Sequence, residues 1–206
     1  KHPLKESLDP LRRAYETGID TGDVEWALIA AIAGSANAFI LGQDLSSLDK
    51  SLAFYNHKAG QYNQTPMLGM GSIYQQATRN LIEPGNAAPW VLEGDVYSEN
   101  QLIQFHSESR DESGIANLFI VKQFLALLFG QPEHAVTFSA EVRQRLRSVV
   151  SSPAVPFFIL YESLAALAVA HQRPWFERAQ LHARVRSNQR LFRKWAHHAP
   201  MNIRHG

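Results

Sequence analysis

A long apolar segment that ends in glycine, followed by a residue that starts helices well, recurs along this chain of 206 residues. The junction is Gly22-Asp23 at its first occurrence, Gly42-Gln43-Asp44 at its second and Gly130-Gln131-Pro132 at its third. Glycine adopts the left-handed conformation that ends a helix, and Asp or Pro suits the start of the next one. Connections this short place consecutive helices side by side and antiparallel. The chain is therefore predicted to fold into helical hairpins.

The apolar periodicity between these junctions predicts eight longer helices and one short helix. No run of alternating β-branched residues is bounded by an Asn-Gly-type turn, so the expected fold class is all-α. Because the hairpins follow one another without a clean 34-residue period, we expect them to stack as a degenerate tetratricopeptide-like superhelix. The expected helices cover residues 8–18, 24–41, 47–62, 66–82, 98–106, 114–129, 132–149, 156–170 and 174–199.

Residues 1–206 are expected to form a single helical-repeat domain with an irregular break at about residues 83–97. This stretch contains two prolines and two glycines, so a sub-array is expected on either side of it. The chain begins at Lys1 rather than at Met, and we expect a fragment of a larger protein. Cysteine is absent, which excludes disulfides and thiolate metal sites and suits a cytoplasmic protein. The most apolar stretch, Phe157 to Ala170, is shorter than the roughly 18–20 residues that span a bilayer, so we interpret it as a buried core helix.

The usual signatures of catalysis and cofactor binding are absent from the sequence. There is no phosphate-binding loop, and Gly69-Met70-Gly71 lies inside a predicted helix instead of at a strand-to-helix turn. The adjacent pair His197-His198 points in directions about 100° apart on a helix, which does not suit a single metal ion. Residue spacing supports no Ser-His-Asp triad and no pair of catalytic carboxylates. We expect no catalytic residue, no cofactor and no metal site.

Glu162 is a carboxylate inside the apolar segment of residues 156–170. A buried carboxylate is costly unless a partner compensates it. Glu162 is therefore either a functional carboxylate in an apolar setting or the partner of an arginine from the basic C-terminal helices. We favour the ion pair.

Charge is distributed unevenly along the chain. Residues 1–139 carry 9 Lys/Arg and 16 Asp/Glu, a balance of −7, whereas residues 140–206 carry 11 and 3, a balance of +8. On the last predicted helix, an apolar stripe contains Leu181, Val185, Asn188, Phe192 and Trp195. The opposite face is basic and contains Arg178, His182, Arg186, Arg190, Arg193 and His197. Such a face binds phosphates, an anionic membrane surface or an acidic protein, or it is only a solvated face.

The end of the chain resembles a known group of proteins. The segment Asn188 to Gly206, NQRLFRKWAHHAPMNIRHG, is similar to the end of the helical-repeat region in large bacterial signalling proteins. The most specific part is the string from Trp195 to Asn202. Weaker similarity covers Thr17 to Leu45, Ala116 to Gln131 and Pro156 to Leu167, so the resemblance spans most of the chain. In these proteins, a protein-kinase-like domain and an AAA/STAND-type ATPase precede the repeats, and GAF or PAS domains and a histidine kinase often follow.

The resemblance implies a non-catalytic protein-interaction and signal-relay module of a multidomain sensor kinase or ATPase in bacterial signal transduction. Its partners are expected to be neighbouring domains of the same polypeptide or other proteins, and nucleic acid is not expected. Two alternatives stay open: a small-molecule sensor with a pocket around residues 83–95 and Trp90, and a segment of a nucleic-acid-linked STAND-type transcription regulator. The motif positions, interpreted as a structural corner or an interface to the next domain, are Trp195, His197, His198, Pro200 and Asn202.

Overall fold

The computed structural model describes residues 3–85, 88–100, 103 and 111–203. About 80% of the chain is helical, and the described residues contain no strand, only an isolated bridge between Glu93 and Ser98. The all-α prediction is thus confirmed. The helices are η1 (Leu4–Ser7), α1 (Leu8–Thr21), α2 (Val24–Ile40), α3 (Leu45–Gln61), α4 (Thr65–Ile82), α6 (Glu112–Leu128), α7 (Pro132–Arg145), η2 (Leu146–Val149), α8 (Ala154–Ala170), α9 (Trp175–His198) and α10 (Pro200–Ile203).

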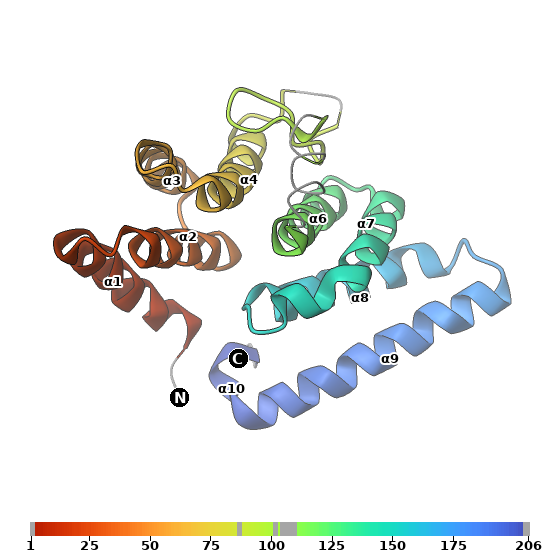
Figure 1. Cartoon of the computed structure of the whole chain (residues 1–206). Helices are drawn as coiled ribbons and strands as arrows, with labels where there is room; N and C mark the ends of the chain where they lie inside the picture. Colours follow the sequence, from red (N-terminus) through yellow and green to blue (C-terminus); the bar gives the residue numbers. More distant parts are fainter. Residues whose placement is uncertain (1–2, 86–87, 101–102, 104–110, 204–206) are drawn as a thin grey trace.

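The helices pair as four antiparallel hairpins, α1/α2, α3/α4, α6/α7 and α8/α9 (Figure 1). Successive hairpins meet through α2, α4, α6 and α8, each of which contacts the next, and α2 also contacts α8. The first and last described helices, η1 and α10, lie close together in Figure 1, and the Leu4 amide donates a hydrogen bond to Asn202 Oδ1 at 2.6 Å. The helix α9 packs on α8 and α10, and its residues on the face turned away from α8 are exposed.

The predicted junctions form as glycine turns. Gly22, Gly42 and Gly130 have φ values of 81°, 65° and 73°, the left-handed region that residues with side chains rarely adopt. Asp44 caps α3 by accepting a hydrogen bond from the Ser47 amide at 2.8 Å, and this bond holds the pKa of Asp44 below its usual value. Asp23 occupies the corresponding position before α2, but its side chain makes no capping hydrogen bond.

The irregular residues after α4 pack into the core instead of lying outside it. Leu92 and Tyr97 are fully buried in a cluster that α2, α3, α4 and α6 share. Within this cluster, the Tyr74 hydroxyl of α4 donates to Asn117 Oδ1 of α6 at 2.8 Å, and burial raises the pKa of Tyr74. Of the short helix predicted over residues 98–106, Glu99, Asn100 and Ile103 are helical, and the other residues after Asn100 lie outside the described residues.

The helix α8 is only partly the buried helix that its composition predicts. Phe158 and Ile159 are almost completely buried, whereas Leu160, Leu164 and Leu167 remain 39%, 44% and 47% exposed on the opposite face. Apolar composition on all sides does not tell which side of a helix is covered, so the prediction of a fully buried helix was wrong for one face.

Gly71 marks a close approach between helices and provides a test of the packing. A Cβ at this position would lie 2.0 Å from Asn56 Oδ1 and 2.8 Å from Ile32 Cδ1. Asn56 is held by its hydrogen bond to Gln75 at 2.8 Å. Although alanine favours helices, Gly71→Ala is expected to lower the free energy of unfolding by about 1–3 kcal/mol because it overpacks this contact.

The matched control is Gly60→Ala in α3, where an added Cβ meets nothing within 4 Å. This substitution is expected to raise the free energy of unfolding by roughly 0.5–1 kcal/mol, since it removes glycine's backbone freedom in the unfolded chain. Urea denaturation followed by circular dichroism measures both variants. Equal effects of the two substitutions would contradict the close approach at Gly71.

Candidate interaction surface

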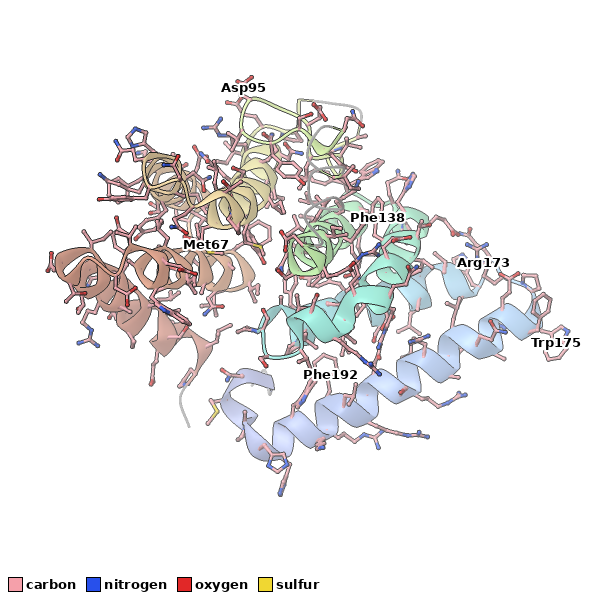
Figure 2. All side chains as sticks on the ribbon, viewed as in Figure 1. Met67, Asp95, Phe138, Arg173, Trp175 and Phe192 are labelled. Carbon is pink, nitrogen blue, oxygen red and sulfur yellow. The ribbon has the colours of Figure 1, made fainter. Side chains whose placement is uncertain are left out.

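The inner face of α9 attaches it to α8. Val185 and Asn188 are buried, and the partly buried Phe192 and Trp195 pack against the cluster that α6, α7 and α8 form. The rings of Phe192 and Trp195 lie edge to face, with 5.6 Å between centroids, and Figure 2 shows Phe192 directed towards α8. These are the positions of the apolar stripe predicted from the sequence.

A buried polar network also joins α9 to α7 and α8. Arg143 Nε donates to Glu162 Oε1 at 2.8 Å, and its Nη2 donates to Glu162 Oε2 and, at 2.9 Å, to Asn188 Oδ1. Asn188 Nδ2 in turn donates to Glu162 Oε2 at 2.7 Å and to Ser163 Oγ at 3.0 Å. The guanidinium also lies over the Phe158 ring, 5.2 Å from its centroid. Charge-assisted and bidentate bonds of this kind are the strong ones.

This network accounts for two sequence features. Glu162 has an arginine partner, as expected, and the partner is Arg143 of α7, within the basic segment of residues 140–206. Asn188, a polar residue in an apolar stripe, holds both members of the pair at once. Hydrogen bonds from Arg143 and Asn188 hold both oxygens of the Glu162 carboxylate, so this carboxylate attaches α9 to α7 and α8.

The outer face of α9 carries the predicted basic residues, which are here called the basic surface: Arg178, His182, Arg186, Arg190, Arg193 and His197. His182 is half-buried and the other five are exposed. Within the part of the chain that the structure describes, none of the four arginines pairs with a carboxylate. From Arg178 to Arg193 the basic surface extends about 22 Å, at 1.5 Å per helical residue.

Two aromatic side chains begin α9 next to the basic surface. Trp175 is 75% exposed and Phe176 is 49% exposed, with their rings edge to face and their centroids 6.1 Å apart. Trp175 extends from the outer end of the α8–α9 turn in Figure 2. The exposure of this pair was not predicted from the sequence. The sequence feature that could have indicated an exposed aromatic pair is the placement of two large apolar residues directly after Pro174, which precedes the helix.

The motif at the end of α9 forms a corner. The helix ends at His198, and Pro200 starts α10. Asn202 binds the backbone of Leu4, whereas His197 and His198 are exposed, with ring centroids 5.1 Å apart. The described residues contain no group of His, Asp and Glu side chains that holds a metal ion.

Two clefts lie between the helices, and neither is lined by a residue of the basic surface. One of about 580 Å³ lies between α7, α8 and the first half of α9, and its charged lining is Arg143, Arg173, Arg184, Glu162 and Glu177. Arg173 pairs with Glu133, and Arg143 pairs with Glu162, so most of its charges are compensated. The other, of about 440 Å³, lies between α4 and residues 83–95, where the sequence predicts a small-molecule pocket. Trp90 is not among its lining residues, because its ring stacks on His134 at 5.3 Å.

No known protein family, curated protein or solved structure matches this chain. The resemblance to bacterial signalling proteins therefore stays an expectation from the sequence. Among the described helices, none combines the length and the apolar composition that crossing a membrane requires.

Proposed function

We propose that this chain is a non-catalytic interaction module whose basic surface docks an acidic protein segment. The observation that carries the proposal is the row of four arginines on α9, which have no carboxylate partner among the described residues and begin beside the exposed Trp175. Arginine and tryptophan are the residues most enriched at energetic centres of protein interfaces. The buried Arg143–Glu162–Asn188 network keeps the inner face of the same helix attached, so the outer face is presented on a fixed support.

An acidic protein segment suits this surface better than a nucleic acid or a membrane. Affinity for those polyanions comes from many phosphate contacts and from a large positive field. Here the basic segment of residues 140–206 is offset by the balance of −7 in residues 1–139, and the net charge is only +1. A single helical face with an aromatic anchor at one end fits a protein segment that contains carboxylates and apolar side chains.

The wider setting of the proposal comes from the sequence resemblance. On the basis of this resemblance, we propose that the four hairpins form a degenerate tetratricopeptide-like superhelix in the cytoplasm. The module then relays signals within a multidomain sensor kinase or ATPase. Consecutive hairpin contacts from α2 to α8 and the attached α9 support a scaffold role. The acidic partner is then a neighbouring domain or another protein.

Fluorescence anisotropy with a labelled peptide of repeating Glu-Glu-Leu tests the proposal. The quadruple substitution Arg178→Gln, Arg186→Gln, Arg190→Gln and Arg193→Gln is expected to weaken binding at least tenfold, about 1.4 kcal/mol. The four side chains are exposed, so thermal stability should change little.

The matched control removes the same charge from α1 and α3 through Arg12→Gln, Arg13→Gln, Lys50→Gln and Lys58→Gln, and it should weaken binding less than twofold. Failure of the wild-type chain to bind the peptide, or equal losses in the two variants, would overturn the proposal. Tighter binding to a labelled DNA duplex than to the peptide would favour the nucleic-acid alternative instead.

A further inference from the structure

The first hairpin carries a second charged and aromatic surface, opposite in sign to that of α9. Three carboxylates, Asp20, Asp23 and Glu25, surround the turn from α1 to α2, and Trp26 follows in the first turn of α2. These four residues are here called the acidic corner. All three carboxylates are exposed, and within the described residues none of them pairs with a cation.

The aromatic residue of the acidic corner is unusually open to solvent. Trp26 is 66% exposed, although it belongs to a mainly apolar helix. The next two residues of this helix, Ala27 and Leu28, are completely buried. Further aromatic surface lies beside α1: Phe54 of α3 is 50% exposed, its ring lies edge to face with that of Tyr15 at 6.3 Å between centroids, and the Lys58 ammonium lies 5.9 Å from its centroid.

The turn from α1 to α2, which carries the acidic corner, and the turn from α8 to α9, where the basic surface begins, lie on opposite sides of the molecule (Figure 1). The α1/α2 hairpin lies on the left of Figure 1, and the α8–α9 turn lies at its right edge. An exposed tryptophan follows each of these two turns: Trp26 lies beside carboxylates, and Trp175 lies beside arginines. Tryptophan faces attract guanidinium groups, so the acidic corner offers the arginines of the basic surface both an ionic partner and a cation–π partner.

We infer that the acidic segment that docks on α9 is the acidic corner of a second copy of this chain. The inference rests on the proposed function, because it names the partner of the same basic surface. The two surfaces differ, so the contact is head-to-tail and leaves one acidic corner and one basic surface free at the two ends of the assembly. Copies then associate into open rows, and the association weakens as salt screens the exposed charges.

Sedimentation velocity of the full chain tests the inference. The wild-type chain, with a monomer mass of 23.1 kDa, is expected to give species of two or more copies as its concentration rises at low salt. One variant neutralises the acidic corner through Asp20→Asn, Asp23→Asn and Glu25→Gln. The other is the quadruple arginine variant of α9. Each variant alone should remain a monomer.

An equimolar mixture of the two variants is the decisive sample. The first variant keeps its basic surface and the second keeps its acidic corner, so only one contact forms and the mixture should stop at a pair. Species larger than a pair in the mixture, or rows formed by either variant alone, would overturn the head-to-tail contact.

A wild-type chain that stays monomeric at every concentration while it binds the Glu-Glu-Leu peptide would also overturn the inference. In that outcome, the proposed function stands and another acidic protein occupies α9. A wild-type chain that neither associates nor binds the peptide would remove both proposals. The variant with the neutralised acidic corner keeps an intact α9, so peptide binding by it confirms that its fold is preserved.

Discussion

Replacing Arg143 with methionine is expected to lower the free energy of unfolding by about 3–5 kcal/mol. The substitution leaves the carboxylate of Glu162, which is only 6% exposed, without its bidentate partner. The Asn188 Oδ1 atom also loses the hydrogen bond that it accepts from Arg143 at 2.9 Å. A buried charge without compensation costs far more than the pair contributes when it is intact. Urea denaturation followed by far-ultraviolet circular dichroism measures the loss.

Two further variants separate the buried charge from a general loss of arginine. Arg145→Met, in the same helix, removes pairs with Glu112 and Glu141, whose side chains are 59% and 37% exposed, and should cost at most about 1 kcal/mol. The double variant Arg143→Met with Glu162→Leu removes both charges and should recover most of the stability. An Arg143→Met loss no larger than that of Arg145→Met would show that the network is dispensable.

The same substitution also tests how α9 is attached. If the network fixes α9, then Arg143→Met should increase hydrogen exchange in the middle of α9 more than in α2 or α4, which lie outside the network. The basic surface would then lose its rigid support, and binding of the acidic peptide should weaken although no arginine of that surface has changed.

The sequence predicted the features that depend on neighbours along the chain. The positive φ values at Gly22, Gly42 and Gly130 follow from turn chemistry, which acts over three or four residues. The burial of Val185 and Asn188 follows from helical periodicity in the same way. Position 23 shows the limit of such local rules, because Asp23 has the right place for a cap and makes no capping bond.

The features that depend on residues far apart in the sequence could not be predicted. Asn188 looked misplaced until α7 and α8 brought Arg143 and Glu162 to it. Leu164 and Leu167 match the composition of a buried helix, yet they remain 44% and 47% exposed. The placement of the acidic corner and of Trp175 on opposite sides of the molecule (Figure 1) depends on the packing of all four hairpins, so it could not be predicted from local patterns. Periodicity tells which side of a helix is apolar, but not which helices pack against that side.

Lys122 is a polar residue whose burial and pairing were not predicted from the sequence. Breaking its ion pair is expected to produce the second large loss of stability. This lysine lies in the apolar helix α6, with its side chain only 6% exposed, and it pairs with Glu99 after the irregular segment. Its ammonium lies 4.7 Å from the centroid of the Phe138 ring. Glu99 also accepts a hydrogen bond from the Leu92 amide at 3.1 Å. Glu99 therefore ties the irregular segment to α6.

Glu99→Leu is expected to cost about 3 kcal/mol or more, because it leaves the Lys122 ammonium buried among apolar groups and the Leu92 amide without its acceptor. Lys122→Met with Glu99→Leu should recover most of this loss, since methionine fills the same space between the aromatic rings. Glu93→Leu, an exposed position in the same segment, is the control and should change stability by about 0.5 kcal/mol at most. Urea denaturation measures all three variants.

The comparison between Glu99→Leu and its double variant decides what holds residues 88–98 against the helices. Full recovery in the double variant means that the charge pair is compensated but adds little, and that the buried side chains of Leu92 and Tyr97 fix the segment. Partial recovery means that the hydrogen bond from the Leu92 amide to the Glu99 carboxylate stabilises the fold independently of the charge pair. The double variant restores the charge balance but does not restore this acceptor. A Glu99→Leu loss as small as that of Glu93→Leu would contradict the burial of Lys122, because a desolvated ammonium cannot lose its carboxylate at so small a cost.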